Sequence, residues 1–237
     1  MKTLIAVYTT RAGQGSTFWG TSLAWTLSER RKVVLVDADM EAGTIANLFA
    51  LRLDGQGIAN CFGDRPARSE ELEQQLVPVP GRPNLMVVPG LHGDSPGYEM
   101  SEALHKLGPA LLGINTDVVI ADLGHPLMHP NLRSARGAAE AICQVFHRAF
   151  IVIRAEHALL ACSINVLRAA RPPFGEIVVG FDPKDGHRKD VLATLGHELP
   201  DLPVREDYVW DAKRARELSV GGTPMTLGQI ERALNLI

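Results

Sequence analysis

Small residues dominate a loop near the start of the chain, between an apolar run at 4–8 and a helical pattern that starts at Thr17. These small residues are Ala12, Gly13, Gly15 and Ser16. They let a phosphate chain approach the backbone, where successive amides and the positive end of the helix dipole attract anions. A second apolar run at 33–36 ends on Asp37 and Asp39, whose carboxylates suit a hard cation or a proton. This order predicts a phosphate-binding βαβ unit.

Strands and helices alternate along the rest of the chain. We expect further strands at 85–88, 118–121, 150–153, 177–180 and 202–205, and a break in the chain from Pro78 to Pro83 before the first of them. We expect helices at about 40–51, 68–76 (with Ser69 as N-cap), 131–145, 158–170, 188–195, 211–218 and 226–236, and an amphipathic helix with Ala103, Leu104, Leu107 and Leu111 on one face. This alternation predicts an α/β fold, a single doubly wound and mostly parallel sheet with helices on both faces.

We find no repeat, low-complexity tract or linker, so we expect one domain over residues 1–237. Ligands of such sheets bind beyond the carboxyl ends of the strands. The loops at 9–16, 37–43, 122–130 and 154–157 should therefore share one edge.

Composition excludes several classes of protein. Hydrophobic residues make up 46% and charged residues 22%, which is ordinary for a globular protein, and the net charge of −3 makes nucleic acid an unlikely partner. Three separated cysteines indicate a reducing compartment without a zinc site. No apolar run has the length of a transmembrane helix, and the chain opens directly on a strand pattern. We therefore expect a cytoplasmic protein that contacts a membrane only indirectly.

The segment from Thr10 to Thr17 resembles the deviant Walker A motif of ParA/MinD-type ATPases. Within that superfamily, Gly15-Ser16-Thr17-Phe18 is similar to the CpaE/TadZ branch, which is associated with tad-type pilus assembly. VDADMEAGTIANLF resembles the switch I region of this branch, and VVIADLGHP resembles its Walker B and switch II regions. With NLMVVPG and a late Gly-Gly-Thr-Pro, the resemblance covers nearly the whole chain.

The resemblance implies a site for ATP or ADP with Mg²⁺. The phosphates would lie on the backbone of the loop residues Ala12, Gly13, Gln14, Gly15, Ser16, Thr17 and Phe18. Thr17, Asp37 and Asp122 would hold or approach Mg²⁺, and Asp39 would lie near the attacking water. The same resemblance implies a nucleotide-dependent homodimer with protein partners.

For each of these residues a simpler structural role is the alternative. The Thr17 hydroxyl would then cap the helix, and the aspartates would be solvated turn residues.

Two positions depart from the family pattern. Ser16 replaces the Walker lysine, which removes a positive charge from the phosphate cradle, and Arg11 stands where the family has its signature lysine. An arginine can be supplied across a dimer, so we treat Arg11 as a candidate catalytic residue. We expect slow or absent hydrolysis. At the base-binding end, Gly180 replaces the usual asparagine, and Phe181 would stack on a base or belong to the core.

Other polar residues lie near the expected ligand edge. Arg133, Arg136 and Arg154 are alternative sources of the missing charge, although exposed arginines are usually solvated. His125 and His129 are four residues apart, a spacing at which two histidines on a helix can bind one metal ion. Pro126 and Pro130 oppose a regular helix, so we expect no zinc there.

Three functions remain open at this point. The first is a ParA/MinD-like nucleotide switch of the CpaE/TadZ type, and the second is a pseudo-ATPase scaffold that binds little nucleotide. The third is an NAD-binding oxidoreductase, because Gly13-x-Gly15 precedes Asp37 at a suitable distance. Phe18 is too large for the third glycine of that fingerprint, which makes the third function the least favoured.

Overall fold

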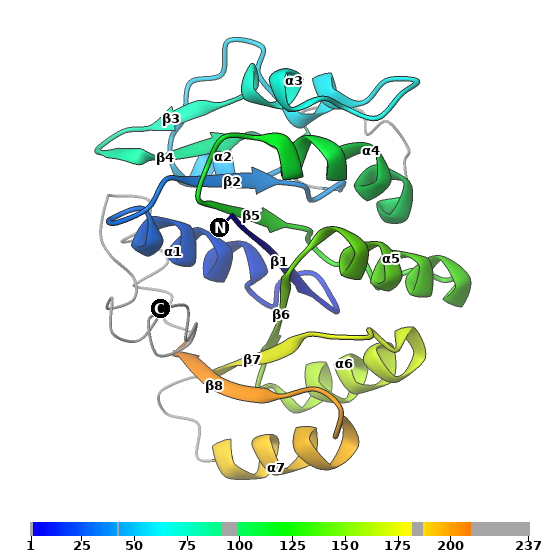
Figure 1. Cartoon of the computed structure of the whole chain (residues 1–237). Coiled ribbons are helices and arrows are strands. Elements are labelled where there is room, and N and C mark those ends of the chain that lie inside the picture. Colours follow the sequence, from blue (N-terminus) through cyan, green and yellow to red (C-terminus); the bar gives the residue numbers. More distant parts are fainter. Residues whose placement is uncertain (1, 42, 92–98, 182–186, 210–237) are drawn as a thin grey trace.

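The computed structural model describes residues 2–41, 43–91, 99–181 and 187–209. Within them, an eight-stranded sheet has the order β3-β4-β2-β5-β1-β6-β7-β8, and Figure 1 shows the strands following one another in this order. The strands are β1 (Thr3–Thr9), β2 (Val33–Asp37), β3 (Val77–Val79), β4 (Arg82–Val88), β5 (Val118–Asp122), β6 (Arg148–Arg154), β7 (Glu176–Phe181) and β8 (Val204–Val209). All neighbouring pairs are parallel except β3 and β4.

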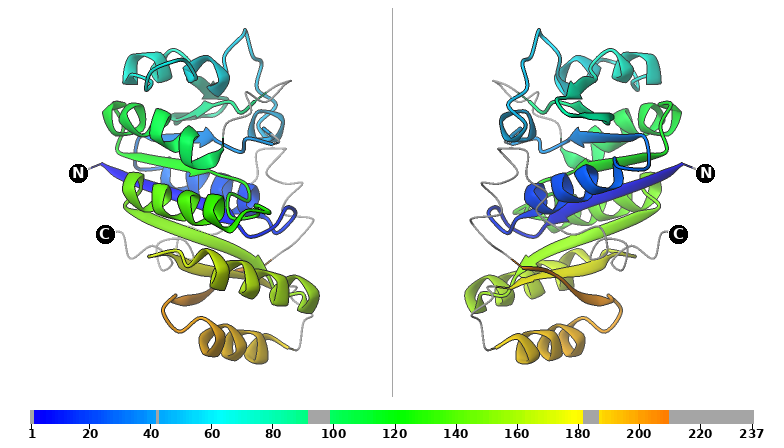
Figure 2. Two further views of the ribbon diagram at one scale, coloured as in Figure 1. Left: turned by 90° about the vertical axis from the view of Figure 1, so that its right-hand side faces the viewer. Right: turned by 90° about the vertical axis from the view of Figure 1, so that its left-hand side faces the viewer.

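Helices cover both faces of the sheet. They are α1 (Ser16–Leu27), α2 (Ile45–Leu48), α3 (Ser69–Glu73), α4 (Met100–Gly113), α5 (Leu132–Val145), α6 (His157–Ala170) and α7 (Arg188–Glu198), with a 3₁₀ turn, η1, at Ile58–Cys61. The two views of Figure 2 bring α4, α5 and α6 to the front on one side and α1 on the other.

Two apolar clusters hold these layers together. On one face, Phe18, Trp19 and Leu23 of α1 pack with residues of β1, β2 and β5. On the other face, α4, α5 and α6 bury leucine, isoleucine and alanine side chains against the same strands. Because both faces are covered, β1, β2 and β5 consist almost wholly of buried residues, as the central strands of a parallel sheet require. The predicted doubly wound fold is confirmed.

Three local predictions were wrong. The helix expected at 40–51 is limited to Ile45–Leu48. Arg68, not Ser69, is the N-cap of α3, because the Glu71 side chain accepts a hydrogen bond from the Arg68 main-chain N–H.

The third error is the break expected at 78–83, which is a β-hairpin. Pro80 and Gly81 lie between β3 and β4, and Gly81 has the positive φ of 75° that the third position of a type II turn needs.

The strand order places several loops at one edge of the sheet. β1 lies between β5 and β6, and Asp37 at the end of β2 is in register with Asp122 at the end of β5. The main-chain N–H of Thr9 donates to the carbonyl of Gly124 at 2.8 Å, which joins the loops after β1 and β5. The predicted common edge of the loops after β1, β2 and β5 is therefore present.

Among the described residues, no helix is long and apolar enough to cross a membrane. The helices predicted at 211–218 and 226–236 and the late Gly-Gly-Thr-Pro lie outside the described residues.

Candidate functional site

The loop between β1 and α1 has the backbone of an anion site. Gly13 and Gly15 have φ of 82° and 96°, a left-handed conformation that favours glycine. Gly15 is the N-cap of α1 and offers no side-chain cap to the helix. The main-chain N–H groups of Gly13, Gly15, Ser16 and Thr17 have no acceptor among the described residues. A helix start with open N–H groups attracts phosphate oxygens.

Side chains of the first turn of α1 point in different directions. Phe18 and Trp19 are buried in the core, where Trp19 packs on Phe150 with ring centroids 4.8 Å apart. Ser16 is 5% exposed and Thr17 is half-buried. The hydroxyls of Ser16 and Thr17 lie near the Asp122 carboxylate and act to lower its pKa. Neither hydroxyl makes a hydrogen bond of ordinary geometry to Asp122 Oδ2.

Two buried carboxylates, of Asp37 and Asp122, end neighbouring strands, and that of Asp122 lies beside the start of α1. Asp37 Oδ2 accepts from the main-chain N–H of Ile45 at 2.9 Å, and Asp122 Oδ1 accepts from that of Gly124 at 3.3 Å. The second oxygen of each, Asp37 Oδ1 and Asp122 Oδ2, is buried without a hydrogen-bond partner among the described residues. Unpaired buried carboxylate oxygens are costly, and in folded proteins such groups are usually satisfied by water or a bound ion.

The charge state of these groups reflects that cost. Burial raises the pKa of Asp37 to about 7, and repulsion from Asp122 and Asp39 adds to the effect. Burial likewise raises the pKa of Asp122 to about 6, opposed by the nearby Thr17 hydroxyl and the Gly124 N–H. A cation between the two strands would relieve both desolvation and mutual repulsion.

Glycines allow the acidic loops to pack this closely. A Cβ on Gly124 would lie 2.5 Å from Asp39 Cγ, and one on Gly90 would lie 2.7 Å from Asp37 Cγ. Asp39 Oδ1 also accepts from the main-chain N–H of Glu41 at 2.9 Å. The positions of Asp37 and Asp39 therefore depend on loops that belong to other strands.

The described residues fit Mg²⁺ better than a metal held by protein ligands alone. No group of three or more His, Cys, Asp or Glu side chains within the described ranges is arranged as a complete metal site. Mg²⁺ is usually bound by one or two carboxylates together with phosphate oxygens and waters. Asp122, Asp37 and the Thr17 hydroxyl match that donor set.

The arginines proposed as replacement charges lie in different surroundings. Arg11 is exposed on the loop itself. Arg154 pairs with Glu156 at 2.6 Å, and Arg136 Nε donates to the carbonyl of Ala169 near the end of α6. Arg133 lines a hollow with Glu99 and other residues of α4 and α5. Of these, Arg11 is the one that lies on the loop between β1 and α1.

The two histidines contact different partners. His125 Nε2 lies 3.2 Å from Glu41 Oε2, which links the loop after β5 to the loop after β2. His129 Nδ1 accepts from the main-chain N–H of Asn131 at the start of α5. Both line a hollow of about 280 Å³ with Asp39, Met40, Met100 and Met128.

At the predicted base-binding end, the structure describes only the backbone. Gly180 is paired with Arg154 across β6 and β7, and its carbonyl accepts from the Ala155 N–H at 2.9 Å. Phe181 ends β7, and its side chain lies outside the described part of the structure.

Sequence reasoning treated Gln14 as a backbone contact and missed its side chain, which is fully buried. Its amide bonds with Thr9 and with Ser163 of α6. The signal in the sequence was a large polar residue, Gln14, between Gly13 and Gly15.

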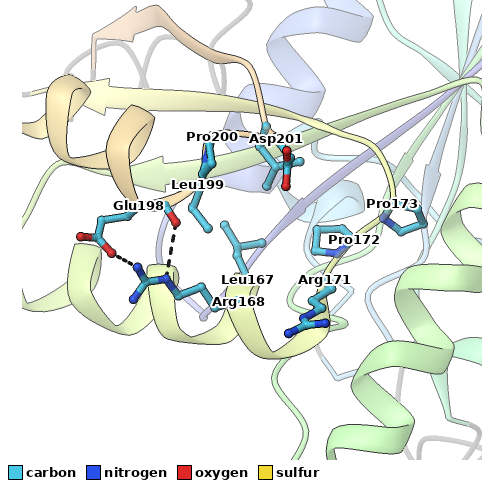
Figure 3. A pocket seen from close by; sticks show the side chains of 10 residues that line it. Leu167, Arg168, Arg171, Pro172, Pro173, Glu198, Leu199, Pro200 and Asp201 are labelled. Carbon is cyan, nitrogen blue, oxygen red and sulfur yellow. Dashed lines mark hydrogen bonds and ion pairs between the residues drawn. The ribbon is translucent and has the colours of Figure 1, made fainter.

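A third hollow lies at the opposite, amino edge of the sheet. Figure 3 shows its lining between the ends of α6 and α7, with a volume of about 730 Å³. Its most prominent charges compensate each other, because Arg168 is paired with Glu198. No residue of the loop between β1 and α1 lines it.

Comparison with known proteins gives a fold match alone. No protein-family model and no curated protein sequence matches the chain. Among solved structures, the cell division ATPase MinD of Pyrococcus furiosus is similar with a TM-score of 0.72 and 15% identity, covering 100% of both chains. The septum site-determining protein MinD of Pyrococcus horikoshii, complexed with Mg-ADP, gives 0.70 and 15%, covering 100% of this chain and 97% of that one.

MinD in the MinC:MinD cell division protein complex of Aquifex aeolicus gives a TM-score of 0.70 and 14% identity, covering 99% of this chain and 96% of that one. At these identities the likeness establishes the fold: this chain folds as the ParA/MinD-type P-loop proteins do.

Proposed function

We propose that this chain, acting as one unit over residues 1–237, is a nucleotide-dependent switch that binds ATP or ADP with Mg²⁺. One observation carries the proposal. Two buried carboxylate oxygens without partners, on Asp37 and Asp122, lie at the sheet edge that also presents the open N–H groups of the glycine loop. Anion donors beside unpaired carboxylates suit a phosphate with a divalent cation. The Mg-ADP complex of a protein with this fold supports the same ligand.

Each residue then has a defined task. The backbone of residues 12–18 holds the phosphates, and the Thr17 hydroxyl and the Asp122 and Asp37 carboxylates hold the cation directly or through water. Asp39 accepts a proton at the phosphate edge. Mg²⁺, when bound, neutralises charge on the phosphate oxygens. We leave Phe181 as the candidate for stacking on the base.

Hydrolysis should be slow or absent. Ser16 is nearly buried and supplies no positive charge where the family has an ammonium group. Arg11 is exposed, so it reaches a nucleotide most readily across a dimer interface. We therefore place the protein near the CpaE/TadZ branch, as a localisation or assembly factor of a pilus system that acts as a homodimer with protein partners.

Calorimetric titration tests nucleotide binding directly. Mg-ADP should release or absorb heat with the wild-type protein, and EDTA should weaken the binding. Thr17→Ala should reduce affinity by about tenfold, the usual cost of one lost ligand hydroxyl. Thr26→Ala is the matched control, because Thr26 is a threonine of the same helix whose hydroxyl donates to the Ser22 carbonyl, away from the loop.

The alternative function is a scaffold that keeps the fold and binds little nucleotide. The observation that favours it is again Ser16, because a buried serine gives the phosphate-binding loop no positive charge at this position. No heat and no thermal shift at millimolar Mg-ATP or Mg-ADP would decide for the scaffold. An NAD-binding oxidoreductase is disfavoured because β5 lies between β1 and β2, unlike the order of dinucleotide-binding sheets.

A further inference from the structure

The side chain of Gln14 is buried beneath the loop between β1 and α1 (residues 10–15), which we call the phosphate loop. Arg11, Ala12 and Gly13 are exposed and Gly15 is half-buried, whereas Gln14 is fully buried. Burying an amide without hydrogen bonds costs several kcal/mol, so its partners determine whether the arrangement is stable.

Those partners form a closed network of four side chains. Thr9 Oγ1 donates to Gln14 Oε1 at 2.8 Å, and Gln14 Nε2 donates to Ser163 Oγ at 3.0 Å. Thr10 Oγ1 donates to Ser163 Oγ at 2.7 Å, and its distance to Gln14 Oε1 is longer, at 3.5 Å. Ser163 Oγ donates its own proton to the carbonyl of Leu159 at 2.8 Å. All four side chains are at most 2% exposed.

The network joins parts that are distant in the sequence. Thr9 and Thr10 follow the central strand β1, whereas Ser163 lies in the middle of α6. Fully satisfied buried networks fix one arrangement of the chain because every alternative leaves polar groups unpaired.

A loop of this composition needs such an anchor. Glycines in the left-handed region lose much conformational entropy on ordering, and the open N–H groups of the loop contribute no internal hydrogen bonds. Ser16 provides no long side chain to cross the loop.

We propose that Gln14 is a positioning residue that, through Thr9, Thr10 and Ser163, keeps the phosphate loop in its binding shape and ties it to α6. Its effect on ligand rests on the proposed nucleotide binding, whereas its effect on the loop does not.

Limited trypsin digestion measures loop order without ligand. Arg11 is an exposed cleavage site inside the loop, and Arg52 is an exposed reference site after α2. Gln14→Leu and Ser163→Ala should each raise the ratio of cleavage after Arg11 to cleavage after Arg52 by about tenfold, as expected when hydrogen bonds that oppose local opening are lost. Ser22→Ala is the matched control, since Ser22 is also fully buried and donates only to the carbonyl four residues earlier.

Mg-ADP titration of the same variants provides the second readout. Gln14→Leu and Ser163→Ala should weaken binding by about tenfold, and the double variant should lose no more than the worse single variant because both act on one network. If Gln14→Leu does not fold, Ser163→Ala carries the same test with a smaller change.

The outcomes separate the two proposals. An unchanged cleavage ratio and unchanged affinity in the Ser163→Ala and Gln14→Leu proteins would overturn the anchor while leaving nucleotide binding intact. A raised ratio in the two variants, together with no Mg-ADP binding by the wild-type protein, would support the anchor and overturn the proposed function. Equal effects of Ser22→Ala would also overturn the anchor.

Discussion

Asp37 and Asp122 determine the charge balance of the site at the scale of single residues. Both carboxylates are 1% exposed, each has one unpaired oxygen, and Asp39 adds a further negative charge nearby. Ser16 contributes no compensating charge. The proposed site should therefore depend on a bound cation more than a site with a lysine would.

The metal-free protein should lose stability as the pH rises. The pKa of Asp37 is raised from 3.8 to about 7 and that of Asp122 from 3.8 to about 6. An acid with a raised pKa binds its proton more tightly when folded, so its stabilising effect is present at low pH and is lost as the pH rises through the folded value. The melting temperature in EDTA should fall between about pH 4 and pH 7.

The Asp37→Asn/Asp122→Asn double variant provides the comparison, since its melting temperature should fall less over that interval. Parallel pH profiles for the two proteins would mean that these carboxyl groups are ionised normally.

Restoring the missing charge should strengthen nucleotide binding. Ser16→Lys should raise affinity for Mg-ATP by about one to two orders of magnitude, the range of a charge-assisted hydrogen bond. Turnover should rise with it, as followed by phosphate release. Ser16→Ala is the control and should leave both quantities near wild type. Wild-type turnover already as fast as that of the Ser16→Lys protein would contradict slow hydrolysis.

At the scale of elements, glycines set the distance between the loops after β2, β4 and β5. A Cβ on Gly90 would lie 2.6 Å from Gly43 Cα, and backbone cannot move aside as a flexible side chain can. Gly90→Ala should therefore destabilise the protein by about 1–3 kcal/mol, the usual range for overpacking. It should also weaken Mg²⁺-dependent binding, because Asp37 would be displaced.

Gly196→Ala is the matched substitution in a helix. Gly196 lies in α7 with no atom within 4 Å of an added Cβ, so alanine should stabilise the protein by about 0.5–1 kcal/mol. Urea unfolding measures both changes. Similar effects of the two substitutions would show that the contacts at Gly90 do not constrain the loops.

The elements also show what sequence could and could not predict. Apolar runs such as 4–8 and 118–121 predicted the central strands because residues buried on both faces leave a continuous apolar pattern. The hairpin at β3 and β4 was missed because prolines there indicated a break, although Pro80-Gly81 is a turn. The helix predicted at 40–51 is limited to α2. The main-chain N–H of Ile45, the first residue of α2, donates to Asp37 Oδ2, so the residues before it belong to the loop after β2.

In the site, the sequence pattern predicted the loop with Gly13 and Gly15, and it predicted that Asp37 and Asp122 would lie at one edge of the sheet. It could not predict which carboxylate oxygens would be unpaired, since that depends on the Ile45 and Gly124 N–H groups. The tie between Gln14 and Ser163 spans 149 residues, so only the fold shows it.

At the scale of the whole molecule, we expect nucleotide to favour a homodimer. Arg11 is exposed on the loop and would reach across to the partner's phosphates. Light scattering should give a larger mass with Mg-ATP than without it, and Arg11→Ala should abolish the difference. Arg52→Ala, at an exposed arginine away from the loop, should leave it unchanged. The same mass with and without nucleotide would remove the proposed role of Arg11 across the interface.

The central claim is that main-chain N–H groups between Arg11 and Thr17, with Asp37 and Asp122 behind them, hold a nucleotide phosphate and its cation without a lysine. A crystal structure of the protein grown in millimolar Mg-ATP tests it most directly. We expect phosphate density on the N–H groups of Gly13, Gly15, Ser16 and Thr17, with Mg²⁺ between that phosphate and Asp122. An empty loop with Asp37 and Asp122 still unpaired, in crystals that contain abundant nucleotide, would contradict the claim.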